Sequence, residues 1–165
     1  MLVDVVDENN NPIGQAQRAN LLSQHLNFRT VHALLVHADR GLLLQRLPAD
    51  HPRSPNLLGS SIAGYLKAGE TYVQAAHRKL RDELRVEARL RNVGEFEMRD
   101  ERSRKFVGVF DGLLTATPFF DSAQIADIVY LPLDEIATLL AQRPGLFTAT
   151  FRHVYGYYIH AQGTS

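Results

Sequence analysis

Short runs of apolar residues, interrupted by turn-forming residues, fill the first part of the chain and predict strands. Leu2 to Val6 alternates apolar and acidic positions and is followed by an Asn- and Pro-rich turn and by Ile13 to Ala16, which is typical of a hairpin. Arg18 to His25 has the spacing of a short helix. Thr30 to His37 and Leu42 to Leu47 are nearly continuous apolar runs joined by a four-residue turn, so we expect a second hairpin in a sheet buried on both faces.

A helix is predicted in the middle of the chain, after a segment that cannot be regular structure. Pro48 to Pro55 contains three prolines, and Leu57 to Ala63 then leads into a glycine turn. Thr71 with Gln74 three residues later is a capping-box pattern, so the helix should begin there and end near Leu84. Its apolar stripe and its charged arc lie on opposite sides at about 100° per residue. The stripe is Val73, Ala76, Leu80 and Leu84, and the arc is Arg78, Lys79, Asp82 and Glu83.

The second half of the chain repeats the strand pattern and then turns helical. The predicted strands and loops are, in order, strand Val86 to Glu97, loop Asp100 to Lys105, strand Phe106 to Leu114, loop Thr115 to Gln124 and strand Ile125 to Leu131. Helical spacing starts at Leu133 and stops before Pro144, and Phe147 to His160 is a last amphipathic helix. Strands on both sides of a central helix, followed by closing helices, predict a mixed sheet with helices on both faces.

Composition narrows the class of protein. The 165 residues contain no long breaker-rich stretch, so we expect a single domain over residues 1–165. Eighteen basic and eighteen acidic residues cancel, which argues against a protein that mainly neutralises a nucleic-acid backbone. There is no cysteine, so disulfides, thiolate metal ligands and thiol nucleophiles are excluded. With no leader-like start and no stretch of 18 apolar residues, we expect a cytoplasmic protein without a membrane partner.

The charged arc of the central helix is the main candidate for chemistry. Asp82 and Glu83 are adjacent carboxylates, Glu70 is a third acid at the mouth of the preceding loop, and Gly64 begins the turn. Such a set suits a hard divalent cation that keeps several waters, as Mg²⁺ does, and that could bridge diphosphate oxygens and activate a water. The alternative is a solvated helix face with i,i+4 pairs such as Lys79 with Glu83, each worth about 0.2–0.5 kcal/mol.

The spacing of these residues resembles that of a known family motif. Within GYLKAGETYVQAAHRKLRDELRV, Glu70 follows Gly64 after five residues, Arg78 follows after seven more, and Glu83 comes five positions later. This stretch, Gly64 to Val86, resembles the Nudix box of the Nudix hydrolase superfamily and is called the box below. The positions that depart from the box are Lys79 and Asp82, which replace glutamates, and Arg85, which replaces glycine.

The resemblance covers about residues 2–135 and implies both a fold and an activity. The fold would be α/β, an α/β/α sandwich with a mixed β-sheet between helices. The activity would be hydrolysis of a diphosphate linkage in a nucleoside diphosphate derivative, a small phosphorylated substrate, with Mg²⁺ or Mn²⁺ as cofactor. In that assignment Arg78, Asp82 and Glu83 are catalytic, the metal ligands are Asp82, Glu83 and the Ala63 carbonyl, the substrate contacts are Arg46, Arg53 and Lys79, and Gly64 and Glu70 shape the box. For both arginines a plain surface position is an equal alternative.

Several departures from the family pattern support a second hypothesis. The positive charge of Lys79 opposes entry of a cation. Gln124 stands where a later acid often serves as base, and the nearby substitutes, Asp121 and Asp127, could be turn formers instead. If the backbone of Arg85 is left-handed, a non-glycine side chain there destabilises the fold by on the order of 1 kcal/mol. The alternative is therefore a Nudix-fold protein that has lost its chemistry and binds a nucleotide or a protein partner.

The matching branch includes isopentenyl-diphosphate isomerase and its bacterial hydrolase relatives, but isomerase activity is not expected. The isomerase uses a cysteine-glycine-histidine-proline turn, where this chain has Ala63-Gly64-Tyr65-Leu66, and a glutamate near the position of Arg104-Lys105. The remaining candidates are expected to be structural. They are His32, His37 and His77, in or beside a strand or on the helix edge, and Tyr155, Tyr157 and Tyr158, in the core or at the interface of a homodimer.

Overall fold

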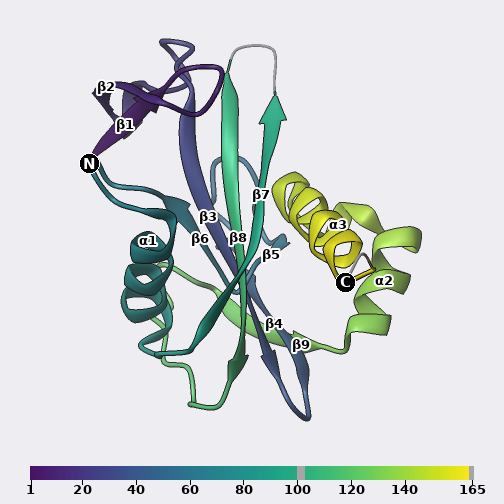
Figure 1. Ribbon diagram of the computed structural model, residues 1–165. Coiled ribbons are helices and arrows are strands. Elements are labelled where there is room, and N and C mark those ends of the chain that lie inside the picture. Colours follow the sequence, from purple (N-terminus) through teal and green to yellow (C-terminus); the bar gives the residue numbers. More distant parts are fainter. Residues whose placement is uncertain (100–102, 164–165) are drawn as a thin grey trace.

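Helices cover both faces of a mixed β-sheet in the computed structural model, which describes residues 1–99 and 103–163. Figure 1 shows α1 (Tyr72–Lys79) on one face and α2 (Leu133–Gln142) with α3 (Ala149–Gly163) on the other. This arrangement confirms the predicted α/β/α sandwich.

The main sheet has seven strands, and its order is β5-β4-β3-β8-β7, with β6 paired to β3 and β9 paired to β4. The bounds are β3 Phe28–His37, β4 Gly41–Arg46, β5 Leu58–Gly59, β6 Ile62–Tyr65, β7 Leu90–Arg99, β8 Arg104–Leu114 and β9 Asp127–Leu131. β3 and β8 are parallel over their whole length, whereas the other pairs are antiparallel, so the sheet is mixed as predicted.

The chain starts with the predicted hairpin, β1 (Leu2–Val6) with β2 (Pro12–Gln17), in a sheet of its own. The short helix expected over 18–25 is wrong in length: only a 3₁₀ turn forms, at Arg18–Asn20. His25 takes a left-handed φ of 57°, which a right-handed helix cannot contain.

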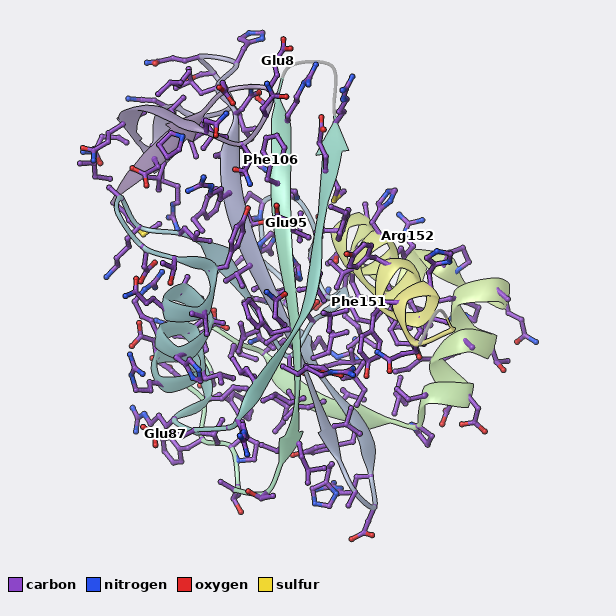
Figure 2. The ribbon with its side chains drawn as sticks, in the orientation of Figure 1. Glu8, Glu87, Glu95, Phe106, Phe151 and Arg152 are labelled. Carbon is purple, nitrogen blue, oxygen red and sulfur yellow. The ribbon has the colours of Figure 1, made fainter. Side chains whose placement is uncertain are left out.

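Two apolar layers separate the sheet from its helices. Because successive strand residues point to opposite faces, Val31, Ala33 and Leu35 pack under α1, whereas Leu34 packs under α2 and α3. Both layers are closed to water, and β3 is buried on both faces as its continuous hydrophobic run predicts. On α3, Phe151 is fully buried and its neighbour Arg152 is exposed (Figure 2).

Several strand boundaries differ from the prediction, and three of them have a clear cause or consequence. β7 begins at Leu90 instead of Val86, because the backbone N–H of Val86 still bonds the helix carbonyl of Leu80. β9 begins at 127 instead of 125, because a turn at Asp121 takes up the N–H groups of residues 124 and 125. β8 already begins at Arg104, so Arg104 and Lys105 are not loop; the rest of the predicted loop, residues 100–102, lies outside the described residues.

Candidate functional site

The box helix begins as the sequence predicts and ends in an unusual turn. Thr71 is the N-cap, and the full capping box with Gln74 is present. α1 ends at Lys79, and the chain continues as a π-helical turn, η2 (Leu80–Leu84). Arg85 then takes the left-handed conformation, with φ 53° and ψ 38°, so the backbone cost considered for a non-glycine residue at that position applies. A π-turn inside a helix often marks a functional site, because it re-aims the side chains around it.

The charged arc of this helix is more buried than expected. Of its members only Asp82 is mainly exposed, at 62%, whereas Arg78, Lys79 and Glu83 are exposed by 16%, 21% and 13%. The predicted apolar stripe is wrong at Val73, which is exposed. The other three members of the stripe, Ala76, Leu80 and Leu84, are fully buried as predicted, and Ala75 is buried beside them.

Arg78 and Glu70 clamp the loop before the helix. The Arg78 guanidinium donates to both Glu70 oxygens, at 2.7 and 3.0 Å, and to the backbone carbonyl of Tyr65 at 3.0 Å. Burial alone raises the pKa of the Glu70 carboxyl, but the hydrogen bonds from Arg78 and from the Lys67 backbone outweigh it, so that the pKa is lowered. Glu70 is therefore a structural acid, and Arg78 ties the box helix to β6.

Glu83 has both carboxylate oxygens engaged. Oε1 lies 2.6 Å from the Lys79 ammonium, one helical turn away, and Oε2 accepts a hydrogen bond of 2.6 Å from the side-chain amide of Gln45 on β4. The same amide nitrogen of Gln45 donates to the Ser61 carbonyl at 2.8 Å. The ion pair between Lys79 and Glu83, which was the alternative to a metal site, is therefore present. It is partly buried and lies beside the glycine turn.

The Lys79 side chain runs across that turn. A Cβ added at Gly64 would lie 2.6 Å from Lys79 Cε and 3.2 Å from its ammonium, so only glycine leaves the lysine this path. Among the residues that the structure describes, no group of three or more His, Asp or Glu side chains is placed to hold a metal ion. The donor set therefore does not fit Mg²⁺ while Lys79 is paired with Glu83.

Arg46 and Arg53 are the two expected substrate contacts. In the described part of the chain, neither forms a hydrogen bond or a salt bridge with Glu83. Arg46 follows Gln45 along β4, so its side chain leaves from the opposite face of the sheet, and it donates to the Asn56 carbonyl at 3.0 Å. Arg53 is exposed in the loop between β4 and β5.

Asp121 and Asp127, the two acids considered as a replacement for the base missing at Gln124, form hydrogen bonds with residues close to them in the chain. One Asp121 oxygen accepts the N–H of Ala123 at 2.9 Å, the turn-forming role that was the alternative for it. Asp127 is exposed and accepts the N–H of its own neighbour, Ile128, at 2.8 Å. Gln124 is also exposed. Within the described residues, none of the three has a hydrogen bond to Glu83.

His32 is a buried structural histidine, as expected. Its Nδ1 lies 2.7 Å from the Ser60 hydroxyl, and burial, with a smaller effect of the Lys105 charge, lowers its pKa from 6.5 to about 3. His37 accepts two backbone N–H groups of its turn and meets the Tyr130 ring edge-on. Tyr155 and Tyr158 point from α3 into the core between this helix and the sheet, so the core alternative is confirmed for both.

The buried neutral His32 predicts a specific pH dependence of stability. Its folded pKa lies below its unfolded value, so its contribution is complete above pH 6.5 and is lost as the pH falls toward 3. We expect the free energy of unfolding to fall by about 1.4 kcal/mol per pH unit within that window. Chemical denaturation from pH 7 to pH 4 measures it, with His32→Asn as the non-titrating control; equal losses in both proteins would contradict the assignment.

Sequence reasoning missed Gln45, the residue that holds Glu83 from the sheet. It is buried, and it directly follows three leucines in the strand, LLLQ. A buried amide within such a run must find partners, and that signal could have marked it. The buried hydroxyl of Ser61, which bridges the backbones of β3 and β4, was missed in the same way.

With this geometry in place, the comparisons with known proteins identify the family. A model described as the NUDIX domain matches residues 26–151, so the chain belongs to the Nudix family. A Nudix hydrolase of Deinococcus radiodurans is 28% identical over 142 residues, which cover 84% of this chain and 83% of the relative. The isopentenyl-diphosphate Delta-isomerase 2 of Photorhabdus laumondii is 26% identical over 159 residues, 91% of this chain and 88% of that protein.

A solved structure agrees with this assignment. The crystal structure of DR0079 from Deinococcus radiodurans superposes with a TM-score of 0.80 at 26% identity, over 96% of this chain and 99% of that one. The family implies hydrolysis of nucleoside diphosphate derivatives, which are small phosphorylated compounds, generally with a divalent metal. Among the described residues, no helix combines the length and the apolar character needed to cross a membrane.

Proposed function

We propose that the protein is a hydrolase that cleaves the diphosphate linkage of a nucleoside diphosphate derivative at the turn between β6 and the box helix. The observation that carries the proposal is the Glu83 carboxylate, held by Gln45 and Lys79 beside Gly64. The Arg78–Glu70 clamp supports it, because the clamp keeps this turn rigid. In the reaction one water adds to a phosphorus and the P–O bond to the bridging oxygen breaks, which gives a nucleoside monophosphate and the phosphorylated remainder of the substrate.

The chain's own residues divide the work. Lys79 supplies a positive charge that can contact a diphosphate oxygen when it leaves Glu83. Asp82, Glu83 and the Ala63 carbonyl would hold Mg²⁺ or Mn²⁺ once that ion pair is broken. A metal ion held there would stabilise the developing charge on the phosphoryl oxygens. Lys79 and the metal ion would thus compete for the Glu83 carboxylate. Turnover is therefore expected to require a high concentration of the metal ion.

Glu83→Gln is expected to lower turnover on the order of 100-fold or more, because the amide removes the negative charge of the site. The measurement is product release from a panel of nucleoside di- and triphosphates, nucleotide sugars and dinucleotides, with Mg²⁺, Mn²⁺ or EDTA. Glu87→Gln is the matched control, since Glu87 is an exposed glutamate just beyond the box helix (Figure 2). Activity of Glu83→Gln equal to that of the parent would remove the proposal.

The ion pair between Lys79 and Glu83 favours a second candidate, a protein that binds a nucleotide or a protein partner without cleaving anything. At 2.6 Å the lysine neutralises the acid that a metal needs. A ligand affinity that EDTA leaves unchanged, with no turnover on any compound of the panel, would favour this candidate. Metal-dependent turnover by the parent would exclude it.

A further inference from the structure

A pocket outside the box lies on the face of the sheet that α1 covers. It is an open pocket of about 480 Å³ at the turn between β3 and β4, lined by Arg40, Thr117, Pro118, Ile128 and Tyr130. The volume falls within the range of about 300–1,000 Å³ that is typical of small-molecule sites. None of these five residues belongs to the box.

The pocket begins one strand away from Glu83. Ile128 on β9 lies directly opposite Gln45 on β4 in an antiparallel pair, so the two side chains share a face and their Cβ atoms are about 5 Å apart. The Gln45 amide in turn donates to Glu83 at 2.6 Å. A molecule bound at Glu83 can therefore extend over Ile128 into the pocket.

The chemistry of the pocket suits a flat ring with polar edges. The Arg40 guanidinium lies 4.1 Å from the centre of the Tyr130 ring, a close cation–π contact that holds it in place. His37 fixes the same turn, since its Nδ1 accepts the backbone N–H groups of Asp39 and Arg40. Within the described part of the chain, no salt bridge joins Arg40 to a carboxylate, so its N–H groups remain free for a ligand.

We propose that this pocket binds the nucleobase of the substrate, with Arg40 donating two parallel hydrogen bonds to adjacent acceptor atoms on the base edge. Guanine offers such a pair in O6 and N7, the arrangement that a guanidinium fork matches best. Ile128 and Pro118 provide apolar contact for the ring. The inference rests on the proposed function, since it assigns the base to the pocket and the diphosphate to the Glu83 end.

Calorimetric titration of the full chain with GMP, in EDTA, tests the pocket without any cleavable diphosphate. The parent should bind GMP about tenfold or more tightly than ribose 5-phosphate, because the latter lacks the base. Arg40→Ala should weaken GMP binding about tenfold, and Arg40→Lys nearly as much, because lysine keeps the charge but not the planar fork. Arg152→Ala is the matched control, since Arg152 is exposed on α3, across the sheet (Figure 2).

Other outcomes would overturn the inference. Equal binding of GMP and ribose 5-phosphate, or full affinity in Arg40→Lys, would mean that the pocket recognises phosphate charge. Absence of GMP binding to the parent would also reject it. Its failure is distinguishable from that of the proposed function: GMP binding that needs Arg40, without turnover of any diphosphate, rejects the hydrolase alone. Turnover with a KM unchanged by Arg40→Ala rejects the pocket alone.

Discussion

Lys79→Glu should raise metal-dependent turnover by about tenfold or more, because it removes the ammonium that competes for Glu83 and adds a carboxylate beside it. The ion pair of 2.6 Å would be lost, and two acids one helical turn apart would then face the Gly64 turn. The measurement is the initial rate of product release at a fixed Mn²⁺ concentration, with the compound that the parent cleaves fastest, or with the whole panel if the parent is silent.

Arg81→Glu is the control for Lys79→Glu, because it makes the same charge reversal at an exposed position of the same helical segment. It should leave the rate within about twofold of the parent, as expected for a screened surface charge. A Lys79→Glu protein slower than the parent would contradict the competition and would mean that the contact of Lys79 with the diphosphate outweighs its effect on metal binding.

Arg78→Ala should lower the free energy of unfolding by about 2 kcal/mol, because it leaves the partly buried carboxylate of Glu70 without its main partner. The two side chains are exposed by only 16% and 14%, and the guanidinium also satisfies the Tyr65 carbonyl. Urea denaturation at pH 7 measures the loss. The lowered pKa of Glu70 fixes the sign of the pH dependence. The pair stabilises the fold fully above pH 4.5, the ordinary pKa of a glutamate, and less as Glu70 becomes protonated at lower pH. The difference between parent and variant should therefore narrow in acid.

Arg91→Ala is the control for Arg78→Ala. Arg91 makes an equally short ion pair with Asp111, but the Arg91 side chain is 62% exposed. Asp111 is 14% exposed, as Glu70 is, but it keeps a hydrogen bond from the Tyr158 hydroxyl at 3.1 Å, so we expect a loss of no more than about 1 kcal/mol. Equal losses in the two variants would mean that the Arg78–Glu70 clamp contributes no more than a surface pair.

The features that the sequence predicted correctly depend on near neighbours in the chain. The capping box at Thr71 and the pair of Lys79 with Glu83 both follow from spacings of a few residues within one helix. The spacing of Gly64, Glu70 and Arg78 is equally local, and it indicated the family. The family resemblance in turn predicted the fold.

The features that the sequence did not reveal join distant segments. Gln45 reaches Glu83 across 38 positions, and only the packing of α1 on the sheet brings them together. Arg40 and Tyr130 meet because β9 pairs with β4, which no local pattern specifies. Val73 was misassigned because the helical period gives the relative angle of residues but not which part of the helix faces the sheet.

The claim that the Lys79 ammonium takes the place of a metal beside Glu83 is tested most directly by calorimetric titration with Mn²⁺ of the parent, Lys79→Ala and the double variant Lys79→Ala, Glu83→Gln. We predict weak binding by the parent, binding at least about tenfold tighter by Lys79→Ala, and loss of that gain in the double variant. Equal Mn²⁺ affinity in the parent and Lys79→Ala would contradict the account.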